Sequence, residues 1–414
     1  MKNMRNFFWF SIIFIIGFVI IACHDGNGYK PPDPIPEHTP VHFSETGLPV
    51  IYIETENSEP ILSRTDWTNM SNFRIISSIP SHHLERTVSP SDQIRGRGNT
   101  TWGMPKKPYR IRFREDVSLF GLAPARNWVL LANWKDSTLL TATIAFELGR
   151  RFELPFTPTA IHVEVVLNGV HKGSYVLTEH MRVVPGRVNV GNNGWMVELD
   201  THYDEEPKFR TNDMDLPVMI SFPSGPSGAT GDNPVFDFIR TDLNSFATAL
   251  ENLDFNTLWS LVDIDNFVDY IMINEIVRNG ELGHPKSVFM YKNMNISAPN
   301  MRMGPLWDFD WAFGLGGNRS VNVNSAESRM RGGRFSGVFE DPAFVSKYKE
   351  RWNEKYNDIS SISAFINTMF NQLKLSASLN SSIWEPDDYA FEIGRLKTWW
   401  NTRVTYLNTA INSE

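Results

Sequence analysis

One short segment restricts the fold of this 414-residue chain more than any other feature, the run GPLWDFDWAFG at 304–314. It places the carboxylates of Asp308 and Asp310 two positions apart in an otherwise apolar and aromatic stretch. Carboxylates are seldom buried without a partner, because moving a charge out of water is costly. A fold that buries this segment must therefore give both groups a cation, a metal ion or dense hydrogen bonding.

Residues 1–22 have the pattern of an export signal. Lys2 and Arg5 form a basic start, an apolar run follows, and the sequence IIAC at 20–23 resembles a bacterial lipoprotein box. Cys23 is the only cysteine, so no intrachain disulfide can form. We expect a cleaved signal peptide and a lipid on Cys23 that holds the protein at the bacterial cell envelope, periplasmic or surface-exposed, with the outer membrane as the expected site. An uncleaved membrane anchor is the alternative, although the apolar run is short for a spanning helix.

The charge balance is mildly acidic. The chain has 47 acidic and 39 basic residues, and removing the signal takes away two of the basic ones, which leaves 37. This balance argues against a general nucleic-acid binder, although a local basic patch could still bind phosphate. The thirteen tryptophans fit either a large core or aromatic surfaces that meet glycans or partners.

The first half of the chain is predicted to be rich in strands. Residues 23–40 are polar and proline-rich and should form an extended tether. Over residues 41–200, β-branched and apolar runs alternate with turn signals, and Asn168-Gly169 is typical of a hairpin turn. One helix is expected within this region, at about 136–150, with its N-cap at the first of these positions.

The second half is predicted to be mostly helical. Residues 201–234 are rich in Asp, Pro, Gly and Ser, which indicates a loop or a surface insertion. Apolar residues then recur at helical spacing through much of 235–414. A β-rich half followed by a helical half predicts an α+β fold with two lobes.

A basic, glycine-containing segment is the first candidate binding element. The run RGRG at 95–98 can bring the backbone close to a ligand, and Arg95 and Arg97 suit phosphate; a hairpin or a bulge explains the same spacing. If the run KPYRIRF at 107–113 is a strand, Lys107 shares one face with apolar residues. An ammonium group there requires a phosphate or a helix carboxylate, unless the side chain extends into solvent.

Two further segments could contribute carboxylates. Glu179 follows an apolar strand, and it either lines a cleft or ends the strand in solvent. Residues 270–278 have the pattern of a helix that ends in a polar loop, and the strand-like run VFMYK follows at 288–292. Helix, polar loop, strand and Asp-Phe-Asp is the order of a kinase catalytic loop and metal segment. A helix C-cap with a plain connector is the alternative.

Together these segments resemble the spore-coat-H-type (CotH) kinase family, an atypical branch of the protein-kinase-like fold. The resemblance rests on RGRGNTTW at 95–102, KKPYRIRF at 106–113, NEI at 274–276 and GPLWDFDWAFG at 304–314, which occur in family order. Members are similar to secretory-pathway kinases. The resemblance therefore implies an atypical protein-kinase-like two-lobed fold, and the use of ATP with Mg²⁺ or Mn²⁺ to phosphorylate protein substrates.

The resemblance also implies roles for single residues. Asp308 matches the family's metal-binding aspartate, and Asp310 is its close companion. Lys107 is our choice for the lysine that contacts phosphate, with Lys106 as the alternate, and Glu147 could pair with it. The residues expected around the nucleotide are Arg95, Arg97, Lys106, Lys107, Glu179 and Lys286.

The catalytic loop departs from the family pattern. The family usually has Asn-x-Asp, with an asparagine a few residues later. Here Glu281 takes the position of the aspartate, and Pro285 and Lys286 take the later positions. Glutamate is one methylene longer, and catalytic geometry is sensitive to shifts of about 1 Å. Lys286 could supply positive charge near a phosphate in place of a second metal ion.

Two functions are consistent with these observations. The first is a lipid-anchored kinase that transfers phosphate to protein hydroxyls, with Glu281 and Lys107 as catalytic residues. The second is a catalytically inactive, pseudokinase-like member that serves as a ligand-, glycan- or partner-binding module. The altered loop favours the second, as does the expected scarcity of ATP outside the cell. In both cases we expect the membrane as a partner through the lipid on Cys23, and no nucleic acid; the first adds a protein substrate.

Overall fold

The computed structural model describes residues 42–86, 91–295 and 300–414. The predicted signal peptide (1–22) and the whole predicted tether (23–40), with Cys23, lie outside these residues. The described part of the chain belongs to one structural unit. No helix in that part has the length and apolar character needed to cross a membrane.

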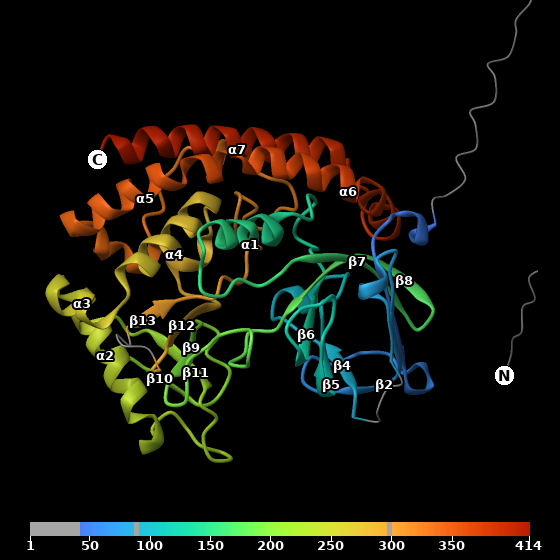
Figure 1. The fold of residues 1–414 in the computed structure, drawn as a ribbon, viewed down its shortest axis with the longest axis horizontal. Coiled ribbons are helices and arrows are strands. Elements are labelled where there is room, and N and C mark those ends of the chain that lie inside the picture. The colour runs from blue at the N-terminus through green and yellow to red at the C-terminus, as the bar shows by residue number, and fades with distance from the viewer. Residues whose placement is uncertain (1–41, 87–90, 296–299) are drawn as a thin grey trace, which may run out of the picture. The chain divides into compact units, whose positions relative to one another are not determined.

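Strands of the first half close into a barrel (Figure 1). They are β1 (Val50–Thr55), β2 (Thr68–Ile76), β3 (Leu84–Arg86), β4 (Gln93–Gly96), β5 (Tyr109–Val117), β6 (Ala125–Leu131), β7 (Ile161–Leu167) and β8 (Val170–Glu179). Within the described residues, seven of them pair in the order β1-β7-β8-β6-β5-β4-β2, and β2 pairs back with β1. β3 adds to β2 outside the ring. β1 and β7 are parallel, and the other neighbours in the ring are antiparallel.

Alternation along β5 shows why the barrel forms. Tyr109, Ile111 and Phe113 are buried and belong to the hydrophobic cluster of the barrel. Arg110 and Arg112 lie between them in sequence and therefore face outward, because successive side chains of a strand point to opposite sides. This strand carries the alternation expected from the sequence, and it puts two cations on the outer surface.

Two local predictions are confirmed. Asn168 and Gly169 join β7 to β8 with φ angles of 49° and 74°, the positive values that a tight hairpin turn of this type requires. A helix, α1 (Thr141–Arg151), follows Asp136. The carboxylate of Asp136 accepts hydrogen bonds from the backbone N–H groups of Thr138 at 2.8 Å and Thr141 at 2.9 Å. The helix begins at Thr141, later than predicted, and its N-cap residue is Leu140 rather than a residue of Asp136-Ser137-Thr138.

A second sheet combines strands from both halves of the chain. It contains β9 (Trp195–Leu199), β10 (Lys208–Arg210), β11 (Pro217–Phe222), β12 (Val288–Lys292) and β13 (Met301–Met303). The strands are ordered β10-β11-β9-β12-β13. The segment 201–234, expected as a loop, therefore contains two strands. Its Pro, Gly and Asp content hid the short apolar run of β11, which is fixed by pairing with β9 rather than by local composition.

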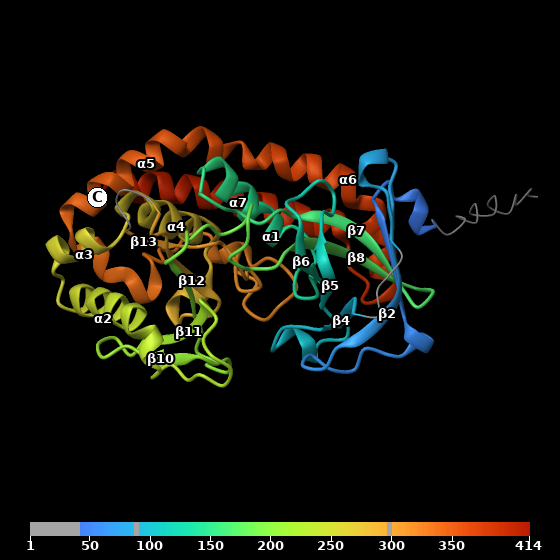
Figure 2. The ribbon, with the colours of Figure 1, turned by 60° about the horizontal axis from the view of Figure 1, so that its bottom comes forward.

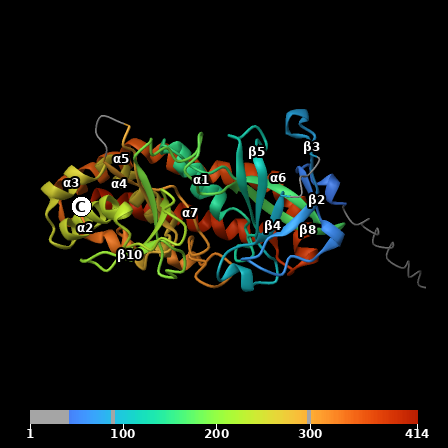
Figure 3. The same cartoon turned by 90° about the horizontal axis from the view of Figure 1, so that it is seen from below.

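Helices cover the second half. They are α2 (Asp237–Glu251), α3 (Phe255–Leu261), α4 (Ile264–Val277), α5 (Pro342–Ser360), α6 (Ile362–Ile383) and α7 (Tyr389–Asn412). α4 is buried along nearly its whole length. Figure 2 shows α6 and α7 running along both the barrel and the region of the second sheet. In Figure 3, α1 lies between the barrel and the second sheet.

The α+β prediction is confirmed in its coarse form, a β-rich first half and a helical second half. The β-rich half is a closed barrel, however, rather than a clear kinase-like lobe. Closure depends on the pairing of β1 with both β2 and β7, and β7 is too distant in sequence from β1 to leave a local signal. The buried residues form two large clusters, one inside the barrel and one around α4 and the second sheet.

Candidate active site

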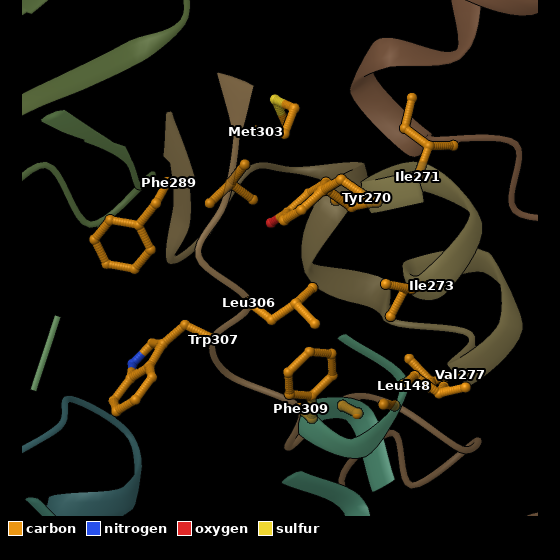
Figure 4. Packing of buried hydrophobic residues seen from close by; sticks show 14 of the residues in the cluster. Leu148, Tyr270, Ile271, Ile273, Val277, Phe289, Met303, Leu306, Trp307 and Phe309 are labelled. Atoms are coloured by element: carbon orange, nitrogen blue, oxygen red, sulfur yellow. The ribbon is translucent and has the colours of Figure 1, made fainter. Parts of the chain in front are cut away.

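The segment 304–314 follows β13 and is anchored by its apolar side chains. Leu306 and Phe309 point toward α4 and α1, whereas Trp307 points away from α4 (Figure 4). The ring of Phe146 in α1 lies 6.3 Å from that of Trp307 and 6.1 Å from that of Phe309, measured between ring centroids. This packing fixes the backbone on both sides of Asp308.

The polar side chains of this segment line a cavity of about 680 Å³ between the barrel and the second sheet. Its charged lining includes Arg95, Arg97 and Arg110 from the barrel, Glu198 and Asp200 from β9 and its end, Glu281 and Lys286 from the loop after α4, and Asp308 and Asp310. Sites for small ligands commonly measure about 300–1,000 Å³, so the space suits a nucleotide.

Asp308 and Asp310 share a part-buried, electrostatically unfavourable position. Asp308 has a φ of 56°, a left-handed conformation that aspartate tolerates better than most residues. Its Oδ1 accepts a long hydrogen bond of 3.5 Å from the backbone N–H of Asp310. Burial raises the pKa of both carboxyl groups, and the neighbouring Asp308 helps to bring the pKa of Asp310 to about 7. Neither carboxylate makes an ion pair with a basic side chain in the described residues.

Glu281 extends the acidic cluster from the opposite loop. It lies in a short 3-10 helix, η6 (Gly280–Gly283), and is only 5 % exposed. Its Oε2 has no hydrogen-bond partner and lies 3.6 Å from Nε2 of His284. Burial, followed by the charge of Asp308, raises the pKa of Glu281 to about 8. A carboxyl group that titrates near neutral pH is suited to accept a proton.

Asn279 connects this loop to the aspartate segment. Its Oδ1 accepts a hydrogen bond from the backbone N–H of Glu281 at 3.2 Å and so caps η6. Its Nδ2 donates to the backbone carbonyl of Asp308 at 3.1 Å and to Oδ1 of Asn274 at 3.0 Å. The side chain of Asn279 therefore fixes the position of the Glu281 loop relative to the Asp308 segment.

Two cations approach the acidic cluster without forming ion pairs with it. The guanidinium of Arg97 lies 5.4 Å from the ring centroid of Trp307. Burial lowers the pKa of Arg97, while the charges of Asp308 and Asp310 oppose this shift. Lys286 lies over the ring of Trp311, at 5.8 Å from its centroid. The cavity thus places carboxylates and cations around one open space.

A family model for the CotH kinase protein matches residues 94–412, well over half of the chain. This chain belongs to the CotH kinase family. The match begins in β4 and ends in α7, so it includes both walls of the cavity. A search of curated proteins found no match.

In this CotH family member, both lysines expected at the phosphate lie away from the cavity lining. Lys107 precedes β5 and donates from Nζ to the carbonyl of Trp102 at 2.7 Å. Lys106 is buried beside α6, where Nζ donates to Oδ1 of Asn380 at 2.8 Å and to the carbonyl of Ser174. The predicted strand face did not apply to Lys107, because β5 begins only at Tyr109.

The two glutamates considered alongside these lysines are also occupied elsewhere. Glu179 ends β8 outside the cavity lining, and its Oε2 accepts a hydrogen bond from the backbone N–H of Thr159 at 2.7 Å. Glu147 forms ion pairs with Arg150 and Arg151 on its own helix, each at 2.9 Å. The expected pairing of Glu147 with Lys107 is therefore absent.

The sequence analysis did not identify two further carboxylates that line the cavity, those of Glu198 and Asp200. Glu198 lies in β9, and burial together with the charges of Asp200 and Glu205 raises the pKa of Glu198 to about 8. Asp200 directly follows that strand, and its Oδ2 accepts a hydrogen bond from the backbone N–H of Ser287 at 3.2 Å. A carboxylate that follows an apolar strand was the signal used for Glu179, and the same signal points to Asp200.

The donor groups fit an ion such as Mg²⁺, which is held by only a few protein ligands, better than a metal ion that is enclosed by protein ligands alone. No group of three or more His, Cys, Asp or Glu side chains in the described part of the chain is arranged to hold a metal ion. Mg²⁺, however, is commonly held by one or two carboxylates together with phosphate oxygens and water. Asp308 and Asp310, which are part-buried and make no ion pairs within the described residues, supply two such carboxylates.

Proposed function

We propose that this CotH family member is a metal-dependent phosphotransferase that binds a nucleoside triphosphate in the cavity and phosphorylates protein hydroxyl groups. One observation carries the proposal. Glu281, Asp308, Asp310 and Arg97 lie around a single cavity of about 680 Å³, although they come from three separate parts of the chain. Structural charges are usually satisfied by direct pairing, whereas these groups make no ion pairs among themselves.

The carboxylates and the cations of the cavity would bind different parts of a metal–nucleotide complex. Asp308 and Asp310 would hold Mg²⁺ or Mn²⁺, which supplies charge neutralisation for the phosphates when bound. Arg97, which faces both aspartates, and Lys286, which lies near Glu281 and Asp308, would neutralise phosphate oxygens. Lys106 and Lys107 have no part in this arrangement, since neither lines the cavity.

Glu281 is the candidate base for the substrate hydroxyl. Its free Oε2 can accept the hydroxyl proton, and a pKa near 8 keeps the protonated and ionised forms close in energy at neutral pH. Positive charge at the aspartates would lower this pKa, because the negative charge of Asp308 helps to raise it. Asn279 acts as a positioning residue that holds the Glu281 loop against Asp308.

Transfer of label from γ-³²P-ATP in the presence of Mn²⁺ tests the proposal. The wild-type protein should label itself or an added protein, and Asp308→Ala should not. Asp265→Ala removes an exposed carboxylate that pairs with Lys347, and it should leave the label unchanged. No label in the wild type, or equal label in Asp308→Ala, would contradict phosphotransfer at this site.

A second candidate function is ligand binding without catalysis. It is favoured by the position of Lys106 and Lys107, which leaves the cavity without the lysine that the family resemblance implied. It is also favoured by Glu281 in place of the family's aspartate. A nucleotide- and Mn²⁺-dependent rise in melting temperature without any transfer of label would identify this function. Neither label nor shift would favour a glycan- or partner-binding envelope protein.

We also propose that a lipid on Cys23 places this domain at the cell envelope. The support is the sequence alone, namely a basic start, an apolar run and the IIAC box at 20–23. In that setting the cavity would face substrates outside the cytoplasm.

A further inference from the structure

The outer surface of β4 and β5 carries three arginines around one tryptophan. Arg95 and Arg110 are direct cross-strand partners, and Arg112 lies two residues further along β5. Their guanidinium carbons lie 4.6, 5.6 and 4.1 Å, respectively, from the ring centroid of Trp67. We call Arg95, Arg110 and Arg112 the arginine wall.

Among the described residues, no carboxylate forms an ion pair with the arginine wall. Its members donate instead to neutral acceptors: Arg95 to the carbonyl of Thr65 at 3.0 Å, Arg110 to Oδ1 of Asn127 at 2.9 Å, and Arg112 to Oε1 of Gln93. None of the three makes an ion pair in the described residues. In addition, Nε of Arg95 is buried and has no hydrogen-bond partner.

Such an arrangement is unfavourable in the free protein. Like charges placed directly opposite each other on neighbouring strands destabilise a sheet. Burial, followed by the charges of Arg182 and Arg95, lowers the pKa of Arg110 to about 9. Stacking on Trp67 offsets only part of this repulsion. The one carboxylate that acts on both Arg95 and Arg110 is Glu205, which is exposed. An anion would relieve the remaining repulsion.

The arginine wall is continuous with the candidate active site. Arg97 directly follows β4, and the charge of Asp308 acts on it. Arg95 and Arg110 line the same cavity as Asp308, together with the exposed Arg182. The aspartates act electrostatically on Arg97, whereas the charges that act on Arg95 are those of Glu205 and other arginines. Arg95 and Arg110 therefore lie beyond the phosphate position, along one side of the cavity, and Arg112 extends the arginine wall outside the cavity lining.

We propose that the arginine wall binds an acidic segment of the protein substrate, next to the hydroxyl group that is phosphorylated. This proposal rests on the proposed function of the cavity. Guanidinium groups pair with carboxylates through two parallel hydrogen bonds, and several of them in a row match a run of Asp or Glu. The chain as a whole has a net charge of −8, so an acidic segment is repelled elsewhere and directed to this surface.

Binding of labelled peptides, followed by fluorescence anisotropy, tests the proposal without requiring catalysis. The probes are a serine peptide flanked by glutamates and the same peptide with glutamine or lysine in their place. The wild type should bind the glutamate peptide selectively. The double variant Arg110→Gln/Arg112→Gln should bind it about tenfold or more weakly, since each loses a charged hydrogen-bond donor. Arg110→Lys/Arg112→Lys should restore part of the affinity.

Controls separate this wall from the nucleotide position and from general charge effects. Arg74→Gln removes an arginine that also stacks on an aromatic ring of the barrel, that of Tyr52 at 4.3 Å, but lies outside the cavity lining, and peptide binding should not change. The shift in melting temperature caused by ATP with Mn²⁺ should be the same in Arg112→Gln, a member of the wall outside the cavity lining, and in the wild type.

Three results would overturn the proposal. The first is equal affinity of the wild type for the glutamate and glutamine peptides, and the second is an equal loss of affinity for the glutamate peptide in Arg74→Gln. The third is binding of a single-stranded oligonucleotide that depends on the arginine wall while the acidic peptide does not bind. If the peptide binds as expected but no label is transferred from ATP, the docking site stands and only the catalytic proposal fails. If label is transferred equally well to acidic and neutral peptides, the docking site fails alone.

Discussion

At the scale of single residues, the site is defined by carboxyl groups that hold protons more tightly than usual. For Glu281 the cause is burial, reinforced by Asp308, and for Asp310 it is burial together with Asp308. Such groups become stable as anions only when a positive charge joins them. Nucleotide-bound metal would provide that charge, which links proton release to ligand binding.

The pH dependence of stability follows from these shifts. Glu281 keeps its proton to about pH 8 when folded, whereas an ordinary glutamate loses it near pH 4.5. The folded state therefore binds more protons between these values, and stability falls as the pH rises through them. In Glu281→Gln, the free energy of unfolding should fall less between pH 5 and 8 than in the wild type, by on the order of 2 kcal/mol.

Chemical denaturation at several pH values measures this difference. Glu251→Gln, a change at an exposed position near the end of α2, serves as the control and should follow the wild type. If the free energy of unfolding changes with pH in the same way in Glu281→Gln and in the wild type, the surroundings do not raise the pKa of Glu281.

Asn279 provides a second test at this scale. Asn279→Ala removes the cap of η6 and the hydrogen bond to the Asp308 carbonyl, and it should cost about 2 kcal/mol of stability. It should also weaken nucleotide binding in the presence of Mn²⁺, because the Glu281 loop loses its register with Asp308.

The matched control is Asn233→Ala. Asn233 caps another 3-10 helix, η5 (Pro234–Phe236), and does not line the cavity. This variant should lose some stability and keep nucleotide affinity. The same loss of affinity in both variants would argue against a positioning role for Asn279.

At the scale of elements, the fold shows which signals are local. The hairpin between β7 and β8, the alternation of β5 and the helical pattern of α4 follow from neighbouring residues, and the sequence predicts them. Barrel closure was not predictable, because β1 pairs with β7 more than a hundred residues away, at Val50 with Glu164 for example. β9 likewise joins the second sheet only through β11 and β12.

The candidate site divides along the same line. Family order marks Asp308, Asp310 and Glu281 as candidates in the sequence; the structure places all three at one cavity, and their roles stay predictions. The positions of Lys106 and Lys107 were not, since they depend on where β5 begins and on α6, which lies in another part of the chain. The terminal amide of Asn380, which accepts from Lys106, has no sequence signal that connects it to the barrel.

Lys106 is therefore expected to join elements rather than bind phosphate. Its Nζ connects the barrel to α6 and lies 4.5 Å from the ring centroid of Tyr175. Lys106→Met should lower the free energy of unfolding by about 2–3 kcal/mol, because buried acceptors lose their donor. Lys107→Met, the neighbouring control, removes one part-buried hydrogen bond and should cost only about 1 kcal/mol.

Nucleotide binding separates the two roles of these lysines. Both variants should keep the wild-type affinity for ATP with Mn²⁺ when measured below their melting temperatures. A strong loss of nucleotide affinity in folded Lys107→Met would indicate that Lys107 contacts the phosphate. That result would agree with the family resemblance and contradict the placement of Lys107 in the structure.

At the scale of the whole molecule, the proposed lipid at Cys23 determines where the cavity operates. Cys23→Ser should move the protein from the membrane fraction to the soluble fraction of the envelope or medium, since the sequence offers no other acceptor for the lipid at this position. Cell fractionation with metabolic labelling by a fatty acid measures both effects. Retention of Cys23→Ser in membranes would favour an uncleaved anchor instead.

The central claim is that the cavity between the barrel and the second sheet is a metal-dependent nucleotide site. Isothermal titration calorimetry with a non-hydrolysable ATP analogue tests it most directly, because it does not depend on catalysis. The wild type should bind the analogue with Mn²⁺ and much more weakly without it, and Asp308→Asn should abolish the metal-dependent part. Equal binding with and without Mn²⁺, or unchanged binding in Asp308→Asn, would contradict the account.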